Sequence, residues 1–166
     1  MHFSEFAGCV VDCRMRRRGV SKLLTISAGG TTGGATSIPS AFSMSYLSGK
    51  TLYGVWFGDG TDASGNAKHN VPVVLKVVYG VTGTAQTTGL LNYVSQSASY
   101  GVTASGLLYF EGDTTQGNTI VSGSTSQYIK ASHMVSGVSE GGAVLMYFDQ
   151  SAAMAYANTL HAVIPF

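Results

Sequence analysis

One short stretch of the sequence has the spacing of a serine nucleophile. Residues 137–141 read GVSEG and match the G-x-S-x-G pattern around Ser139, and Asp149 and His161 follow in the order of a Ser-Asp-His triad. In enzymes with this pattern the serine lies on a sharp turn between a strand and a helix. Here residues 143–148 read as another strand, and no alternating strand–helix pattern surrounds the motif. We therefore interpret residues 137–141 as a hairpin turn and expect no enzymatic activity.

Two other groups of residues contain metal-ligand types without the required pattern. Residues 59–66 alternate oxygen-bearing side chains as a calcium loop does, but they lack the glycine and glutamate that an EF-hand needs. Cys9 and Cys13 are four residues apart, and the four histidines share no close spacing with one another or with acids. We predict a solvated loop at 59–66, buried cysteines and no metal or cofactor. Calcium held in the loop is the alternative.

The only concentrated charge lies near the N-terminus. Arg14, Arg16, Arg17 and Arg18 stand close together in a chain whose formal net charge is only +1. Guanidinium groups can contact phosphates, or they can clamp acidic groups of a neighbouring subunit. Aromatic residues are not interleaved with these arginines, as they are in single-strand-binding modules. We therefore favour a solvated or subunit-clamping arm over contact with nucleic acid.

Trp56 offers a second candidate site, because an exposed tryptophan can stack on a sugar ring. Asp59 and Asp62 follow it in the next loop and could complete a ligand-binding loop. However, the period of two along a strand would place Tyr53 and Phe57 on one face and Trp56 on the other. A shared aromatic platform is then excluded. We favour core or interface packing for Trp56, with a glycan-binding loop as the alternative.

The candidate residues lie in or beside short apolar runs, which turn-forming clusters separate. The runs are rich in Val, Ile, Tyr and Phe, which favour strands, and Gly, Asn, Asp and Ser separate them. The pattern predicts an all-β fold, a jelly-roll-like β-sandwich or barrel, with an extended N-terminal arm and one short C-terminal helix at 151–160. The expected strands are residues 22–27, 51–57, 71–79, 89–95, 107–111, 119–122, 127–131, 143–148 and 161–166.

Length and composition indicate one domain. The chain has 166 residues, of which 45% are hydrophobic and only 10% are charged, against about 25% in typical domains. We assign residues 1–21 to a basic arm and 22–166 to a single β-domain, in which 29–49 form a Gly/Ser/Thr-rich extended segment. No apolar run reaches the length of a membrane helix, and no secretory signal is present in the sequence. We expect synthesis in the cytoplasm and no membrane partner.

In general character the chain resembles virion proteins of tailed bacteriophages, such as capsid decoration proteins, head fibres and tail components. The scarcity of charge, residues 26–35 (ISAGGTTGGA) and the loops at 82–88 and 113–119 carry the resemblance. It implies a protein that assembles in many copies, with an N-terminal arm reaching across a neighbour.

We therefore expect a non-enzymatic capsid decoration (cement) protein that is made in the host cytoplasm and located in the virion. Its expected partners are copies of itself and another virion protein, such as the major capsid protein, with residues 1–49 lacing subunits together. The alternative is a glycan-binding adhesin or receptor-binding β-sandwich of a tail or fibre.

Overall fold

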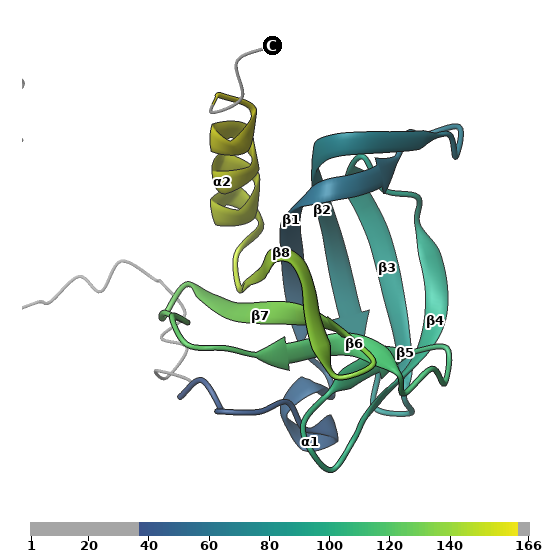
Figure 1. Cartoon of the computed structure of the whole chain (residues 1–166), viewed down its shortest axis with the longest axis vertical. Coiled ribbons are helices and arrows are strands. Elements are labelled where there is room, and N and C mark those ends of the chain that lie inside the picture. The colour runs from purple at the N-terminus through teal and green to yellow at the C-terminus, as the bar shows by residue number, and fades with distance from the viewer. Residues whose placement is uncertain (1–36, 163–166) are drawn as a thin grey trace, which may run out of the picture. The chain divides into compact units, whose positions relative to one another are not determined.

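Eight antiparallel strands close into a barrel, with a short helix before the first strand and a longer one after the last (Figure 1). The computed structural model describes residues 37–162, and it describes residues 141, 161 and 162 by their backbone alone. The basic arm and the predicted strand at 22–27 lie outside the described residues. The elements are α1 (Met44–Leu47), β1 (Thr51–Thr61), β2 (Ala67–Tyr79), β3 (Thr84–Leu91), β4 (Gln96–Val102), β5 (Leu108–Phe110), β6 (Gln116–Ile120), β7 (Tyr128–Val135), β8 (Val138–Tyr147) and α2 (Gln150–Ala162).

The strands follow one another around the barrel in chain order. Each strand pairs with the next, and β8 pairs back onto β1. This arrangement is an up-and-down meander. The expected all-β fold, the barrel and the short C-terminal helix are confirmed. The topology differs from a jelly roll, because a jelly roll has Greek-key connections between strands that are not neighbours in the sheet.

The meander gives the barrel two distinct ends. The β1–β2, β3–β4, β5–β6 and β7–β8 connections lie at one end, which we call the open end. The β2–β3, β4–β5 and β6–β7 connections lie at the opposite end, together with α1, and we call this the closed end.

Side chains of β1 alternate between the inside and the outside of the barrel, as the period of two predicts. Leu52 and Trp56 belong to the interior cluster, whereas Tyr53 and Val55 pack in the cluster beneath α2. The predicted separation of Trp56 from Tyr53 is therefore confirmed. β1 carries apolar side chains on both faces, since one face is buried inside the barrel and the other is covered by α2.

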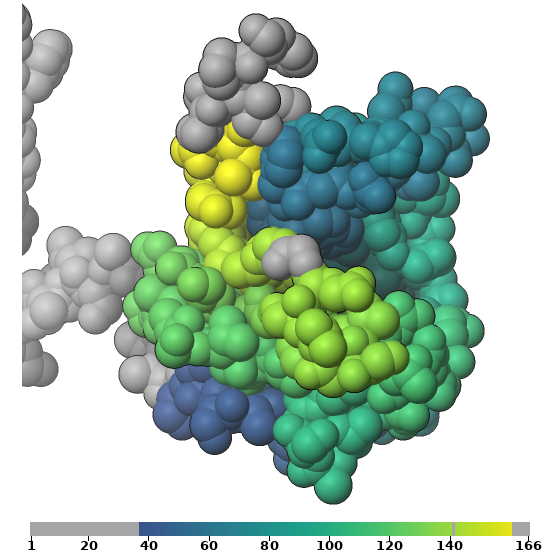
Figure 2. Space-filling view, in the orientation of Figure 1, coloured from purple at the N-terminus to yellow at the C-terminus, as the bar shows by residue number. Residues whose placement is uncertain are grey.

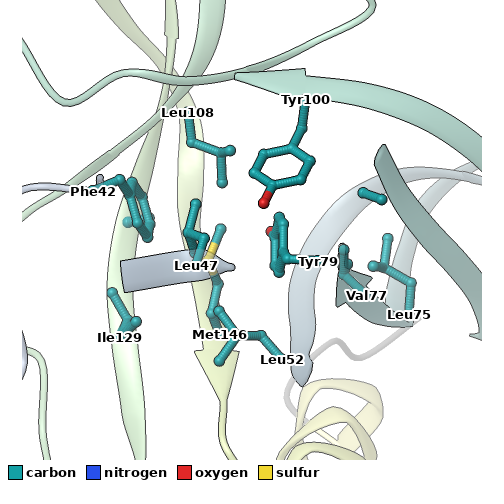
Figure 3. Packing of buried hydrophobic residues seen from close by; sticks show 12 residues of the cluster. Phe42, Leu47, Leu52, Leu75, Val77, Tyr79, Tyr100, Leu108, Ile129 and Met146 are labelled. Atoms are coloured by element: carbon teal, nitrogen blue, oxygen red, sulfur yellow. The ribbon is translucent and has the colours of Figure 1, made fainter. Parts of the chain in front are cut away.

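The segment before β1 closes one end of the barrel. Ser43 caps α1, and its hydroxyl accepts a hydrogen bond from the Tyr46 amide at 3.1 Å. Leu47 is completely buried and Phe42 is only 3% exposed. Figure 3 shows Leu47 among side chains that several strands contribute. Residues 37–49 therefore differ from the predicted extended segment: they fold against their own barrel, because this removes two large apolar side chains from water.

Two tyrosines add a rigid layer at the closed end. The rings of Tyr79 and Tyr100 meet edge to face with centroids 5.0 Å apart. The Tyr100 hydroxyl donates to the Gly80 carbonyl at 2.8 Å, and the Gly49 amide donates to the Tyr79 carbonyl at 2.7 Å. Burial raises the pKa of the Tyr79 hydroxyl far above its usual value. This layer forms a floor inside the barrel.

α2 covers the seam at which the barrel closes. β1 and β8 pair at only three positions, centred on Gly54 and Met146. Ala153 and Ala157 of α2 are fully buried in a cluster with outward-facing residues of β1 and β8. Figure 2 shows α2, in yellow, beside the blue surface of β1 and β2. The predicted helix at 151–160 is confirmed and is slightly longer than expected.

Several predicted strand boundaries differ from the structure. β4 has no predicted counterpart, because its sequence QSASYGV is mostly small and polar. β3 and β6 begin and end earlier than the predicted strands at 89–95 and 119–122. The predicted strand at 161–166 is wrong for its first two residues, which end α2, and the rest lies outside the described residues. Within residues 37–162, no helix has the length and apolar content that crossing a membrane requires.

Candidate ligand-binding cavity

The barrel contains an internal cavity of about 700 Å³. Its floor, toward the closed end, is apolar and consists of inward-facing side chains from three strands: Leu52, Leu75, Val77, Tyr79 and Met146. Sites that hold small molecules usually measure about 300–1,000 Å³ and are mostly apolar. The size and the floor of this cavity therefore suit one small ligand.

The cavity walls become aromatic and polar toward the open end. Trp56, Tyr93 and Phe110 supply rings, and all three are half-buried. The polar residues of the lining come from β1, β3, β4, β6, β7, β8 and the β5–β6 loop. They are Asp59, Thr87, Gln96, Glu111, Asn118, His133 and Glu140. Because Asp59, Glu111 and Glu140 are exposed, the cavity opens to solvent at this end.

Trp56 and Tyr93 form an aromatic wall that hydrogen bonds hold in place. Their rings are nearly perpendicular, with an interplanar angle of 83° and centroids 6.0 Å apart. The Trp56 Nε1–H donates to the Asp59 carbonyl at 3.3 Å, and the Gln96 amide donates to the Tyr93 hydroxyl at 2.8 Å. Burial raises the pKa of Tyr93, whose ordinary value already lies well above physiological pH, so the hydroxyl carries its proton and can donate.

Asn118, a residue of the lining, holds its side-chain oxygen buried behind the cavity surface. It lies on β6 directly opposite His133 of β7, and both residues line the cavity. The Asn118 Oδ1 is buried and has no hydrogen-bond partner within the described residues. A buried carbonyl oxygen without a partner costs about 1–3 kcal/mol, so such atoms are rare in proteins.

Strained backbone is concentrated at the open end. Within residues 37–162, four non-glycine residues have φ near +50°. Asn92, Glu111 and Ser136 lie in the β3–β4, β5–β6 and β7–β8 connections, and Asn70 lies inside β2 at the irregular part of the β1–β2 ladder. At the closed end, the three turns use Gly83, Gly106 and Gly123 for their positive φ angles. Left-handed non-glycine residues cost free energy, and they cluster at functional sites. The positions of these residues therefore mark the open end as the candidate functional end of the barrel.

The β1–β2 hairpin is fixed against the β3–β4 loop at this end. The Thr61 amide donates to the Asn92 carbonyl at 2.9 Å, and the Asn92 side-chain amide donates to the Pro72 carbonyl at 2.8 Å. The approach is so close that a Cβ at Gly60 would lie 2.5 Å from the Asn92 carbonyl oxygen. The ladder is irregular between Gly58 and Gly60, which bends the hairpin. The rim of the cavity is therefore preorganised.

The structure separates the three residues of the predicted ligand loop. Trp56 and Asp59 line the cavity, but Asp62 lies in the turn between β1 and β2, and its side chain stabilises that turn. Its carboxylate accepts the amides of Ser64 and Asn66, both at 2.9 Å, and the Asn66 side-chain amide at 3.0 Å. The Asn66 side-chain hydrogen bond is the main reason why the pKa of Asp62 lies below its usual value. The interpretation of 59–66 as a loop joining two strands is confirmed for 62–66.

The apparent triad is dispersed along β8 and α2. The predicted hairpin is present, but its turn is only residues 136 and 137, and residues 138–141, which we expected in the turn, already belong to β8. Ser139 therefore lies in β8, with its hydroxyl against that of Ser132. Asp149 lies beyond the other end of β8, where its carboxylate caps α2 by accepting the Ala152 amide at 2.9 Å. His161 is in α2, and its side chain is outside the described residues. The nucleophile pattern therefore has no structural counterpart.

Comparison of the chain with protein-family models, curated proteins and solved structures finds no match. Arg14, Arg16, Arg17 and Arg18 lie outside the described residues. Among residues 37–162, no three His, Cys, Asp or Glu side chains are grouped so that they could hold a metal ion. The cavity is therefore the feature of residues 37–162 that points to a function.

Sequence reasoning missed most of the cavity lining. Tyr93, Glu111, Asn118 and His133 form no motif, because each comes from a different strand or loop. The one usable signal was the period of two in each strand, which marks one face as inward once the sheet is known to close.

Proposed function

We propose that the protein binds one small, largely apolar molecule inside its barrel, without catalysing a reaction. The observation that carries this proposal is the cavity of about 700 Å³, with its apolar floor and polar, exposed rim. Barrels of eight strands are either just filled by their own side chains or have room for one small ligand. Here the closed end is filled and the open half is not.

The lining gives a physical reason for binding. An apolar group on the floor would contact Leu52, Leu75 and Met146, and its transfer from water would be favourable by about 25 cal/mol per Å². Polar groups of the ligand would remain at the rim, near Gln96 and His133. Because the rim is already held by hydrogen bonds, little ordering would be needed on binding.

Trp56 provides the assay. It is the only tryptophan of the chain, and it lines both the cavity and a second hollow outside the barrel, so its fluorescence reports binding at either place and the variants below separate the two. We expect a neutral apolar dye, N-phenyl-1-naphthylamine, to quench Trp56 saturably with a stoichiometry of one. The absence of saturable binding at dye concentrations up to its solubility limit would contradict the proposal.

Filling the cavity supplies the decisive variant. A Cβ at Gly54 would make only ordinary contacts, the nearest at 3.8 Å to Leu75, so a larger side chain there points into the cavity. Gly54→Phe should weaken dye binding at least tenfold. Ala98→Leu, on the wall formed by β4, is the second filling variant. Circular dichroism verifies that each variant is folded.

A matched control addresses a second hollow, of about 620 Å³, that lies outside the barrel beside α2. Tyr128, Tyr147 and Tyr156 contribute to its lining. Tyr156→Ala changes only this outer groove and should leave dye binding unchanged. If Tyr156→Ala abolished binding while both filling variants retained it, the ligand would lie outside the barrel and the proposal would be wrong.

The charge-poor composition supports a second, separate proposal, in which the protein is a capsid decoration component that associates with copies of itself and with a virion protein. Only 10% of its residues are charged, so few ions need to be desolvated at subunit contacts. Light scattering and sedimentation with candidate particles test this role. A monomer that binds no particle would contradict it without affecting the cavity proposal.

A further inference from the structure

The charged side chains that line the cavity have one sign. Three carboxylates line it, those of Asp59, Glu111 and Glu140, whereas no lysine or arginine is among the lining residues that the structure describes. The whole chain is almost balanced, with a formal net charge of +1, so the imbalance is local. A mouth lined by one sign of charge raises the local concentration of the opposite charge.

Two of these carboxylates are held in place by neighbouring groups. Glu111 Oε1 accepts the Ser99 amide at 3.2 Å, and the left-handed backbone of Glu111, with φ of +53°, fixes where its side chain starts. Asp59 Oδ1 lies 2.9 Å from His69 Nδ1 on the exposed hairpin. Glu140 stands on β8, in the same lining. The carboxylates are therefore spread around the rim on three different elements.

Aromatic rings lie within the same lining. Trp56 and Tyr93 meet edge to face, and Phe110 adds a third ring. The face of an aromatic ring attracts a cation, most strongly for tryptophan, and such rings are used to recognise ammonium groups.

These observations agree on one class of ligand. We infer that the cavity takes a cationic amphiphile, with an amine or ammonium group at the rim and an apolar body on the floor. This inference rests on the proposed function, because it concerns the same cavity. His133 is the remaining titratable group of the polar lining, and as a neutral imidazole it can accept a hydrogen bond from the same amine.

The test compares ligands that share one apolar tail and differ in charge. Octylamine, octyltrimethylammonium, octanol and octanoate are titrated against N-phenyl-1-naphthylamine in the full-length protein, with Trp56 as the reporter. We expect both cations to displace the dye at concentrations at least tenfold lower than octanol, and octanoate to be the weakest. Raising the salt concentration from about 0.05 to 0.5 M should reduce the preference, because it screens exposed charges.

The outcomes separate the two proposals. If the dye binds and the four compounds displace it equally, or octanoate does so best, the inference about charge is overturned and the cavity proposal stands. If neither the dye nor any of the four compounds binds, the cavity proposal itself is wrong.

Two isosteric variants locate the effect. Glu111→Gln and Glu140→Gln should each weaken octylamine about three- to tenfold and leave octanol unchanged. Asp149→Asn is the matched control, because it removes the same charge at the cap of α2 and asparagine also caps helices well. Equal losses in all three variants would show a general effect of net charge and would overturn the assignment to the rim.

Discussion

Replacing Leu47 by alanine should loosen the closed end of the barrel. Leu47 is completely buried, although it belongs to a helix of only four residues that precedes the first strand. It packs in the same cluster as Tyr79 and Leu108, which belong to the barrel wall (Figure 3). If α1 is a structural plug, the cost of Leu47→Ala should be that of a core cavity.

The magnitude follows from burial. Fully buried Leu→Ala substitutions cost about 2.7–5 kcal/mol, depending on how far the surroundings collapse. Because α1 is short and lies at one end of the barrel, we expect partial collapse and a loss of about 3 kcal/mol. For a domain of this size that corresponds to a decrease in Tm of about 10 °C. Met44 of the same helix is 37% exposed, so Met44→Ala should cost less than about 1 kcal/mol.

Urea denaturation followed by circular dichroism measures both variants. The m-value should stay constant, because the same surface is exposed on unfolding. If Leu47→Ala and Met44→Ala lowered the free energy of unfolding equally, within about 0.5 kcal/mol, α1 would not be packed in the barrel. Residues 37–49 would then be better described by the extended segment that the sequence predicted. Dye binding by the folded fraction should persist, because Leu47 does not line the cavity.

Three further predictions concern turns and titration. Gly106→Ala should be destabilising by about 1–3 kcal/mol and more so than Gly65→Ala in thermal melts, because both have positive φ but only the first places its Cβ against Ala41, at 2.7 Å. Burial holds the pKa of Tyr79 above the value of about 10 in the unfolded chain, so stability should be intact below pH 10 and fall above it in urea titrations, less so in Tyr79→Phe. Hydrogen bonds in the turn lower the pKa of Asp62, so its contribution should be complete above about pH 4 and lost as pH falls further, and Asp62→Ala should flatten this acid limb.

The strands with strong alternation could be predicted from the sequence. Leu52, Val55 and Trp56 are large residues at positions that alternate between two covered faces, so the start of β1 was located correctly. α2 was found from its alanines, and Ala153 and Ala157 are indeed its buried contacts. In these elements local preference and burial point to the same structure.

The polar strands could not be predicted in the same way. β4 buries Ala98 and Tyr100 and exposes Ser97 and Ser99, so the only large apolar side chain that it buries on its inward face is that of Tyr100. β3 carries Thr87 inward and glycine at position 89, where a Cβ would collide with the Tyr93 carbonyl. Pairing with neighbouring strands, a tertiary effect, decides these segments.

The cavity depends on closure, which a sequence does not display. Glu111, Asn118 and His133 come from a loop and two strands, and only the curvature of the sheet brings them to one rim. Whether the interior is filled or hollow depends on the summed side-chain volumes in the space that closure creates. The small residues Gly54 and Ala98 leave that space empty.

The short β1–β8 seam has a consequence for biosynthesis. The residues that pair where the ring closes are 90 to 94 positions apart along the chain (Val55 with Leu145, Tyr53 with Tyr147), whereas every other ladder joins consecutive strands. On the ribosome, local hairpins can assemble as they emerge, but the ring stays unfinished until β8 has left the exit tunnel. α2 follows β8 directly in the chain and packs over the β1–β8 pairing from outside the barrel. A polypeptide that stops before β8 would leave β1 and β7 as exposed sheet edges, which can pair with other chains.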